Sequence, residues 1–78
     1  MADIIIKLMG ITYKPHGRSE EKLPADAPIS VKDILLKIGY REVGLEFFIV
    51  HRNGEVLKLD SLVNPGDELS IFMPLGGG

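Results

Sequence analysis

The chain has 78 residues, 45% of them hydrophobic and 26% charged, which is the ordinary balance of one small globular domain. A formal charge of −2 with well-mixed signs argues against nucleic acid or a membrane surface as a direct partner. Cysteine is absent, which excludes disulfides, thiolate metal sites and cysteine nucleophiles, and no apolar run approaches the ~18 residues of a membrane-spanning helix. Because the amino terminus also lacks the features of a signal peptide, we expect a cytoplasmic protein.

The first elements predicted along the chain are two strands joined by a turn. Residues 3–13 alternate between two faces, as a strand does. Residues 14–17 form a Pro-Gly turn signal, and residues 18–23 are short and charged, which is typical of an edge strand or a loose loop. The residues expected on the buried face of the first strand are Ile4, Ile6 and Leu8.

One helix is predicted near residues 31–38. Ser30 is its expected N-cap, and Asp33 three residues later favours the positive end of the helix. Gly39 is expected to end it with a left-handed conformation. The helical spacing of the apolar residues predicts one buried stripe, formed by Val31, Ile34, Leu35 and Ile38.

The second half of the chain predicts three more strands. A strand over 45–52 and its return over 55–58 flank Asn53-Gly54, the strongest signal for a type I′ hairpin turn. Residues 60–63 resemble a short 3₁₀ turn, and the last strand is expected over 68–73. In this half we assign to the core Phe47, Ile49, Val56, Leu57 and Leu62.

The order of these elements predicts an α+β fold, in which a sheet packs on a single main helix. Pro74 cannot donate a ladder hydrogen bond, so pairing is expected to stop there. We therefore expect one domain over residues 1–75 and a flexible glycine tail over residues 76–78. Glycine has no side chain, so such a tail can enter a narrow passage and bring a terminal carboxylate to a reaction centre.

The last part of the chain resembles a known family. A Gly-Asp turn (Gly66-Asp67), an acidic residue (Glu68), alternating apolar residues and a final Gly77-Gly78 are similar to the pattern of the ubiquitin-like β-grasp sulfur carriers, the ThiS-like and MoaD-like proteins. The resemblance implies a mixed sheet of four to five strands on one helix. Gly76 departs from the pattern, because relatives commonly carry Ala, Ser or Thr there.

The same resemblance implies a function. Gly78 would be adenylated by an E1-like adenylyltransferase that uses ATP and Mg²⁺, and a persulfide sulfur donor would then convert it to a thiocarboxylate. A sulfur-accepting synthase or thiolase would pass the sulfur to thiazole, a pterin precursor or transfer RNA. Every covalent step takes place in a partner, so the chain is expected to be a carrier and not an enzyme, and to bind no cofactor itself.

Partner binding is expected at the base of the tail, through Phe72, Pro74 and Leu75, with Phe72 on the outer face of the sheet. His16 is expected to be an exposed turn residue. His51 can face the core or the solvent, and no metal site is expected. Two other functions stay open: a ubiquitin-like modifier joined through Gly78 to lysines, and a non-covalent β-grasp binding module. The sequence does not separate thiamine, molybdopterin and transfer-RNA thiolation.

Overall fold

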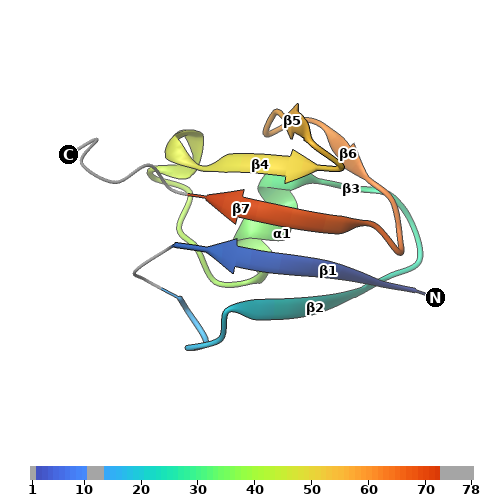
Figure 1. Ribbon diagram of the computed structural model, residues 1–78, viewed down its shortest axis with the longest axis horizontal. Helices are drawn as coiled ribbons and strands as arrows, with labels where there is room; N and C mark the ends of the chain where they lie inside the picture. The colour runs from blue at the N-terminus through green and yellow to red at the C-terminus, as the bar shows by residue number, and fades with distance from the viewer. Residues whose placement is uncertain (1, 11–13, 73–78) are drawn as a thin grey trace.

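In the computed structural model, residues 2–10 and 14–72 are described, and they form a five-stranded sheet with one helix across one face (Figure 1). In chain order the elements are β1 (Ala2–Met9), β2 (Glu20–Ala25), β3 (Ile29–Ser30), α1 (Val31–Lys37), the 3₁₀ turn η1 (Leu45–Phe47), β4 (Ile49–Arg52), β5 (Glu55–Leu57), β6 (Leu62–Val63) and β7 (Glu68–Phe72). The expected α+β β-grasp fold is confirmed. The expected tail, residues 76–78, lies outside the described residues.

The main sheet has the strand order β2-β1-β7-β4-β5. The first and last strands of the chain, β1 and β7, are parallel neighbours near its centre, and the other pairs are antiparallel. The short strands β3 and β6 pair separately as a two-stranded sheet. The sheet is therefore mixed, and β7, which leads to the end of the chain, is held on both sides.

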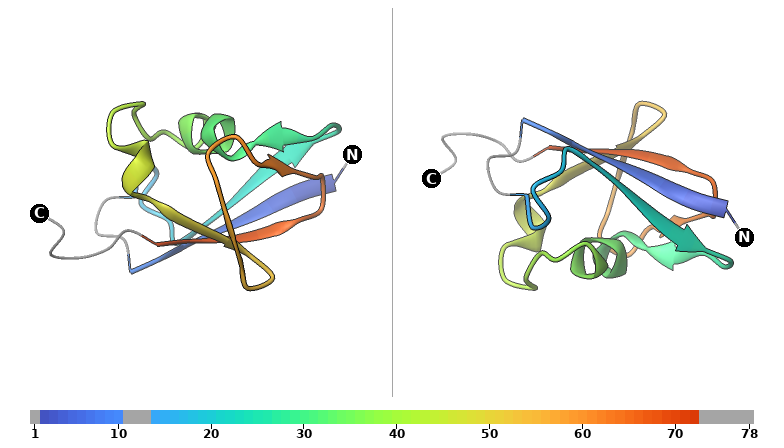
Figure 2. Two further views of the ribbon diagram at one scale, coloured as in Figure 1. Left: turned by 90° about the horizontal axis from the view of Figure 1, so that it is seen from above. Right: turned by 90° about the horizontal axis from the view of Figure 1, so that it is seen from below.

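The helix forms as its sequence predicts. The Ser30 hydroxyl accepts a hydrogen bond from the Asp33 backbone N–H at 3.1 Å, and Gly39 follows the helix with a φ of 110°. The helix lies across one face of the sheet (Figure 2). The four residues of the predicted stripe are buried. Opposite them lie the inward residues of the strands, among them Ile4, Ile6, Leu8, Val50, Leu69 and Ile71.

The strand β2 forms an edge of the main sheet, as expected of a short charged segment. One of its acidic residues, Glu21, points inward and is buried. Its carboxylate is 2.9 Å from His16 Nδ1 and 3.6 Å from Arg18. His16 is an exposed turn residue, as predicted, and its ring additionally ties the 14–17 turn to β2. Of the predicted first strand, residues 11–13 lie outside the described residues.

The predicted strand over residues 45–52 is wrong in its first half. Residues 45–47 form η1 instead, and the strand begins at Ile49. Because Leu45 is buried at the start of this turn, Phe47 is turned outward and 63% exposed. Ile49, also assigned to the core, is 38% exposed, because the inward position of β4 is Val50, which pairs with Ile71.

Three further expectations concern the segment after the hairpin. Asn53 and Gly54 form the predicted turn, with φ values of 54° and 81°. Val56 and Leu62 are wrong as core residues, with 63% and 59% exposure, whereas Leu57 is half-buried against the core. The predicted 3₁₀ turn over residues 60–63 is also wrong. Instead, Leu62 pairs with Ser30 in the small sheet, which turns its side chain outward.

Candidate functional site

Among the described residues, no element covers the face of the sheet opposite α1, which we call the open face (Figure 2). Apolar residues cross this face where β7 ends. Phe72 pairs with Met9 of β1 on one side and with Ile49 of β4 on the other. Their chain neighbours Leu8, Ile71 and Val50 face the helix, so these three point to the open face. We call Met9, Phe72 and Ile49 the apolar row; Phe72 is half-buried, and the other two are 44% and 38% exposed.

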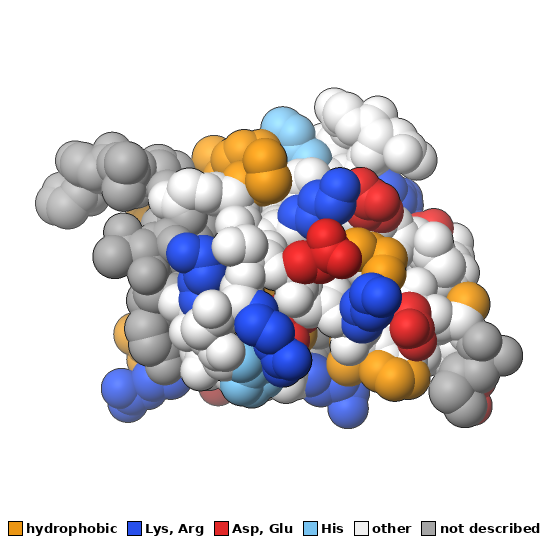
Figure 3. Space-filling view, turned by 60° about the horizontal axis from the view of Figure 1, so that its bottom comes forward, with side chains coloured by type: hydrophobic (Ala, Val, Ile, Leu, Met, Phe, Trp, Pro, Cys, Tyr) orange, Lys and Arg blue, Asp and Glu red, His pale blue; other side chains and the backbone are white. Residues whose placement is uncertain are grey.

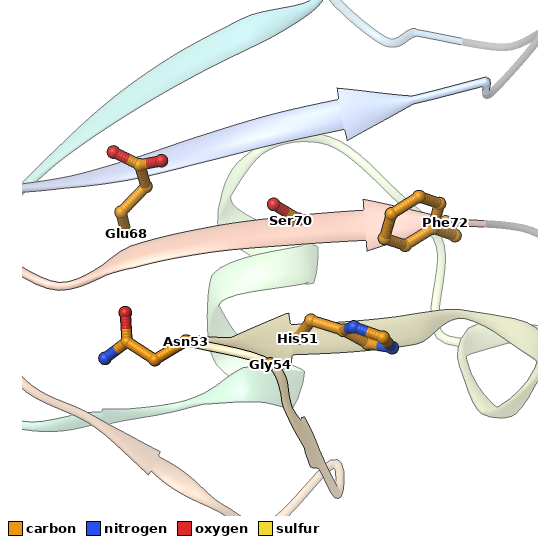
Figure 4. Close-up of a pocket in the computed structure, with 6 residues that line it drawn as sticks. All are labelled: His51, Asn53, Gly54, Glu68, Ser70 and Phe72. Atoms are coloured by element: carbon orange, nitrogen blue, oxygen red, sulfur yellow. The ribbon is translucent and has the colours of Figure 1, made fainter.

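A groove of about 410 Å³ adjoins the apolar row on the same face. Its walls come from β4, the hairpin turn and β7, and they are formed by His51, Asn53, Gly54, Glu68, Ser70 and Phe72 (Figure 4). The rings of His51 and Phe72 are 5.4 Å apart with a tilt of 57°. His51 thus faces the open side of the sheet, which settles the choice that its sequence context left open.

An ion pair lies farther along the open face. Lys7 Nζ lies 3.1 Å from Glu68 Oε2, and both side chains are about half exposed. Such a pair adds little stability because water and salt screen it. Figure 3, which views the molecule obliquely from the β2 side, shows acidic and basic side chains close together and hydrophobic ones beside a histidine. The open face therefore has an apolar contact surface at one end and charged side chains beyond it. Charged side chains of this kind can orient a protein partner that binds the apolar end.

The turn before β7 fixes the register of that strand. The Asp67 carboxylate accepts a hydrogen bond from the Asn64 N–H at 2.9 Å and one from Arg52 Nη1 at 3.2 Å. Arg52 Nη1 also donates to the Leu62 carbonyl at 3.1 Å, and Gly66 has a φ of 90°. Asp67 is thereby tied to both β4 and its own turn. Because a one-residue slip would move Phe72 to the buried face, this turn keeps the apolar row on the open face.

The sequence identified part of this site. Phe72 lies on the outer face as expected, and its role in partner binding stays a prediction. Pro74, Leu75, Gly76, Gly77 and Gly78 lie outside the described residues. Sequence reasoning missed Met9 and Ile49 as its neighbours. Residues 5, 7 and 9 alternate with the buried residues of the first strand, and this pattern could have predicted that Met9 lies on the outer face.

Two observations concern other kinds of site. Within residues 2–10 and 14–72, no group of three or more His, Asp or Glu side chains is placed to hold a metal ion. No helix in the part of the chain that the structure describes is long and apolar enough to cross a membrane.

Comparison with known proteins identifies the family. The crystal structure of SAMP1 from Haloferax volcanii matches with a TM-score of 0.71 and 24% identity, over 99% of this chain and 100% of that chain. A structure of small archaeal modifier protein 1 from H. volcanii matches with a TM-score of 0.69 and 24% identity, over 96% and 100%. These likenesses show the fold. No curated protein matches in sequence. The family model described as ThiS family matches residues 6–78, and the chain therefore belongs to the ThiS family.

Proposed function

We propose that the protein is a sulfur carrier whose Gly78 carboxylate is adenylated by an E1-like enzyme and converted to a thiocarboxylate. The observation that carries the proposal is the family match, which runs from residue 6 through Gly78 and so includes the final glycines. The chain itself acts as a co-substrate. ATP and Mg²⁺ belong to the activating enzyme, and the sulfur comes from a persulfide on a donor protein.

The proposed chemistry starts from an unreactive group. A C-terminal carboxyl group has an ordinary pKa of about 3.5, so at neutral pH it is an anion and a poor electrophile. One of its oxygens attacks the α-phosphorus of ATP, and pyrophosphate leaves. The terminal sulfur of the persulfide then attacks the acyl carbon, and AMP leaves. Reduction of the resulting acyl disulfide by a thiol releases the thiocarboxylate and leaves a disulfide on the donor side.

The fold supports delivery of the tail from a rigid base. Leu69 and Ile71 of β7 are fully buried, and β7 is paired on both sides, so the point where the tail begins is held firmly. The six residues from 73 to 78 can span about 20 Å when extended. A partner that holds Gly78 in its catalytic site therefore contacts the body of the protein close to Phe72.

The body must supply binding energy for this arrangement. Ordering the terminal segment, residues 73–78, costs roughly 6–12 kcal/mol at about 1–2 kcal/mol per residue. Glycine contributes no side-chain contact in return. We assign the main compensating contact to the apolar row and to Pro74 and Leu75, which would bury their side chains against the activating enzyme. The groove beside His51 and Ser70 then provides polar contacts that set the orientation.

Intact mass spectrometry tests the proposal. With its E1-like enzyme, ATP, Mg²⁺ and a persulfide donor, the protein should gain the mass difference between sulfur and oxygen. Deletion of Gly78 should abolish the gain, because the shortened carboxylate no longer reaches the α-phosphate, and an appended residue should block it. Both variants should unfold at the wild-type temperature. Absence of pyrophosphate release from the wild-type protein with any adenylating enzyme would refute the proposal and leave a non-covalent binding module.

A protein modifier is the second candidate. It is favoured by the likeness in fold to small archaeal modifier protein 1 from H. volcanii. Both functions pass through the same acyl-adenylate and differ in the acceptor, which is sulfur in one case and a lysine amine in the other. Isopeptide-linked products without any thiocarboxylate would favour the modifier. The route of the sulfur, to thiazole, a pterin precursor or transfer RNA, is tested by supplying each accepting enzyme with the thiocarboxylate form.

A further inference from the structure

A second apolar surface lies outside the apolar row, on the loop that follows α1. Val43 is 88% exposed and Phe47, in η1, is 63% exposed. Single exposed apolar residues are common on protein surfaces, but two on one short loop near the end of β7 make a candidate contact surface. We propose that Phe47 and Val43 form a second contact with the activating enzyme. This inference rests on the proposed function.

The local structure holds Phe47 outward. Two nearby side chains are anchored: Leu45, two residues earlier, is buried, and the Phe48 ring packs on Tyr40 with centroids 4.7 Å apart. The Phe47 N–H donates to the Gly44 carbonyl and the Phe48 N–H to the Leu45 carbonyl, both at 3.1 Å. Turning Phe47 inward would break this turn and displace a buried neighbour.

The loop is also tied to the helix at its other end. Lys32 Nζ of α1 lies 2.9 Å from Glu42 Oε2, just before Val43. Gly44 has a φ of 92°, which lets the chain reverse between the ion pair and η1. The Lys32 and Glu42 side chains are 44% and 72% exposed, so the pair itself adds little stability. The start of the loop is anchored by Tyr40, which is buried and donates its N–H to the Leu35 carbonyl at 3.1 Å. Val43 and Phe47 therefore lie on a loop with fixed ends. Preorganised presentation lowers the entropic cost of binding, which is the property expected of a recognition surface.

The position of Phe47 indicates that the activating enzyme is the partner that binds this surface. Figures 1 and 2 show η1 at the end of the molecule where β7 finishes. Phe47 is two residues before Ile49, which pairs with Phe72, so its Cα lies within about 12 Å of the Phe72 Cα. This is well inside the roughly 20 Å reach of residues 73–78. An enzyme that has drawn the tail into its catalytic site is thus brought against η1.

The side chains of the loop indicate what kind of surface the activating enzyme presents to it. Phe47 and Val43 call for an apolar pocket, and the exposed carboxylate of Glu46 adjoins Phe47. We therefore assign to the activating enzyme an apolar pocket with a basic residue at its rim. A contact of this kind is made equally in the ground state and during adenylation. It should therefore act on KM for the carrier protein and leave kcat unchanged.

The test measures pyrophosphate release by the E1-like enzyme at varied concentrations of carrier protein. Phe47→Ala should raise KM about tenfold, equivalent to about 1.4 kcal/mol of lost binding, with kcat within about twofold of wild type. Phe47→Leu should recover much of the loss. Leu62→Ala is the matched control, because Leu62 is similarly exposed at 59% but lies on β6, at the opposite end of the molecule from η1 (Figure 1). It should leave both constants unchanged.

Several results would overturn this inference. An unchanged KM for Phe47→Ala, with an active wild-type protein, refutes the second contact and leaves the proposed function intact. A wild-type protein that releases no pyrophosphate refutes both. Loss of folding in Phe47→Ala, judged by thermal unfolding, would assign the residue to stability, and Glu46→Lys then tests the surface in a folded protein by an increase in KM. Dimerisation of the wild type that Phe47→Ala abolishes, measured by light scattering, would assign the surface to a second copy of the chain.

Discussion

Replacing Ile34 with alanine should remove a large share of the stability of this protein. Ile34 is fully buried and lies in the middle of the stripe that α1 packs on the sheet. Substitutions of this kind cost about 2–5 kcal/mol, depending on how far the surroundings collapse into the cavity. Here the facing strands β1 and β7 are paired on both sides, so we expect little collapse and a loss of about 3–4 kcal/mol. A domain of this length has a total stability of only roughly 4–12 kcal/mol.

Guanidinium unfolding followed by circular dichroism measures this loss. The midpoint should fall while the slope stays constant, because the surface exposed on unfolding is almost unchanged. In a thermal scan the expected decrease in Tm is about 12–30 °C. Leu36→Ala is the control, since Leu36 lies on the same helix but is 37% exposed. Equal losses for the two variants would refute the packing argument, because the effect would then arise from the helix itself and not from burial against the sheet.

The remaining predictions concern the partner surface and one ion pair. Phe72→Ala should weaken binding of the activating enzyme by more than about 1 kcal/mol, measured by calorimetry, and change stability less. Unfolding of this variant without a separate binding defect would place Phe72 in the core. The Lys32 ammonium group, which bonds the Glu42 carboxylate, lowers the pKa of Glu42, so Lys32→Gln should raise that pKa toward its ordinary value in an NMR titration. The stabilisation from a lowered carboxyl pKa is present above the ordinary pKa and is lost as pH falls through the lowered one. An unchanged Glu42 titration would show that the pair does not form in solution.

Local signals in the sequence determined those elements whose structure depends on near neighbours. The helix is one of them: Ser30 and Asp33 cap it, its apolar stripe repeats at helical spacing, and Gly39 ends it. The Asn53-Gly54 turn is another, because a type I′ turn needs two positive φ values that this pair tolerates. The resemblance of the last residues to the ThiS pattern also identified the family before any fold was known.

The tertiary structure alone decided which apolar residues outside the helix are buried. A run such as Phe47-Phe48-Ile49-Val50 is apolar at every position, so its alternation does not say which set faces inward. The pairing of Val50 with Ile71 places Val50 on the inward face of β4 and Ile49 on the outward face. Leu45 is buried in a 3₁₀ turn, which leaves Phe47 exposed to solvent.

The neighbours of Phe72 were likewise decided by the tertiary structure. Phe72 acquires Met9 and Ile49 as neighbours because β7 inserts between β1 and β4, which lie far from it in sequence. Strand order and register are set by such non-local pairings, and a shift of one residue exchanges the two faces of a strand. The sequence by itself therefore predicted the helix, the hairpin turn and, through its final glycines, the family. The assembled sheet decided which side chains surround the end of β7.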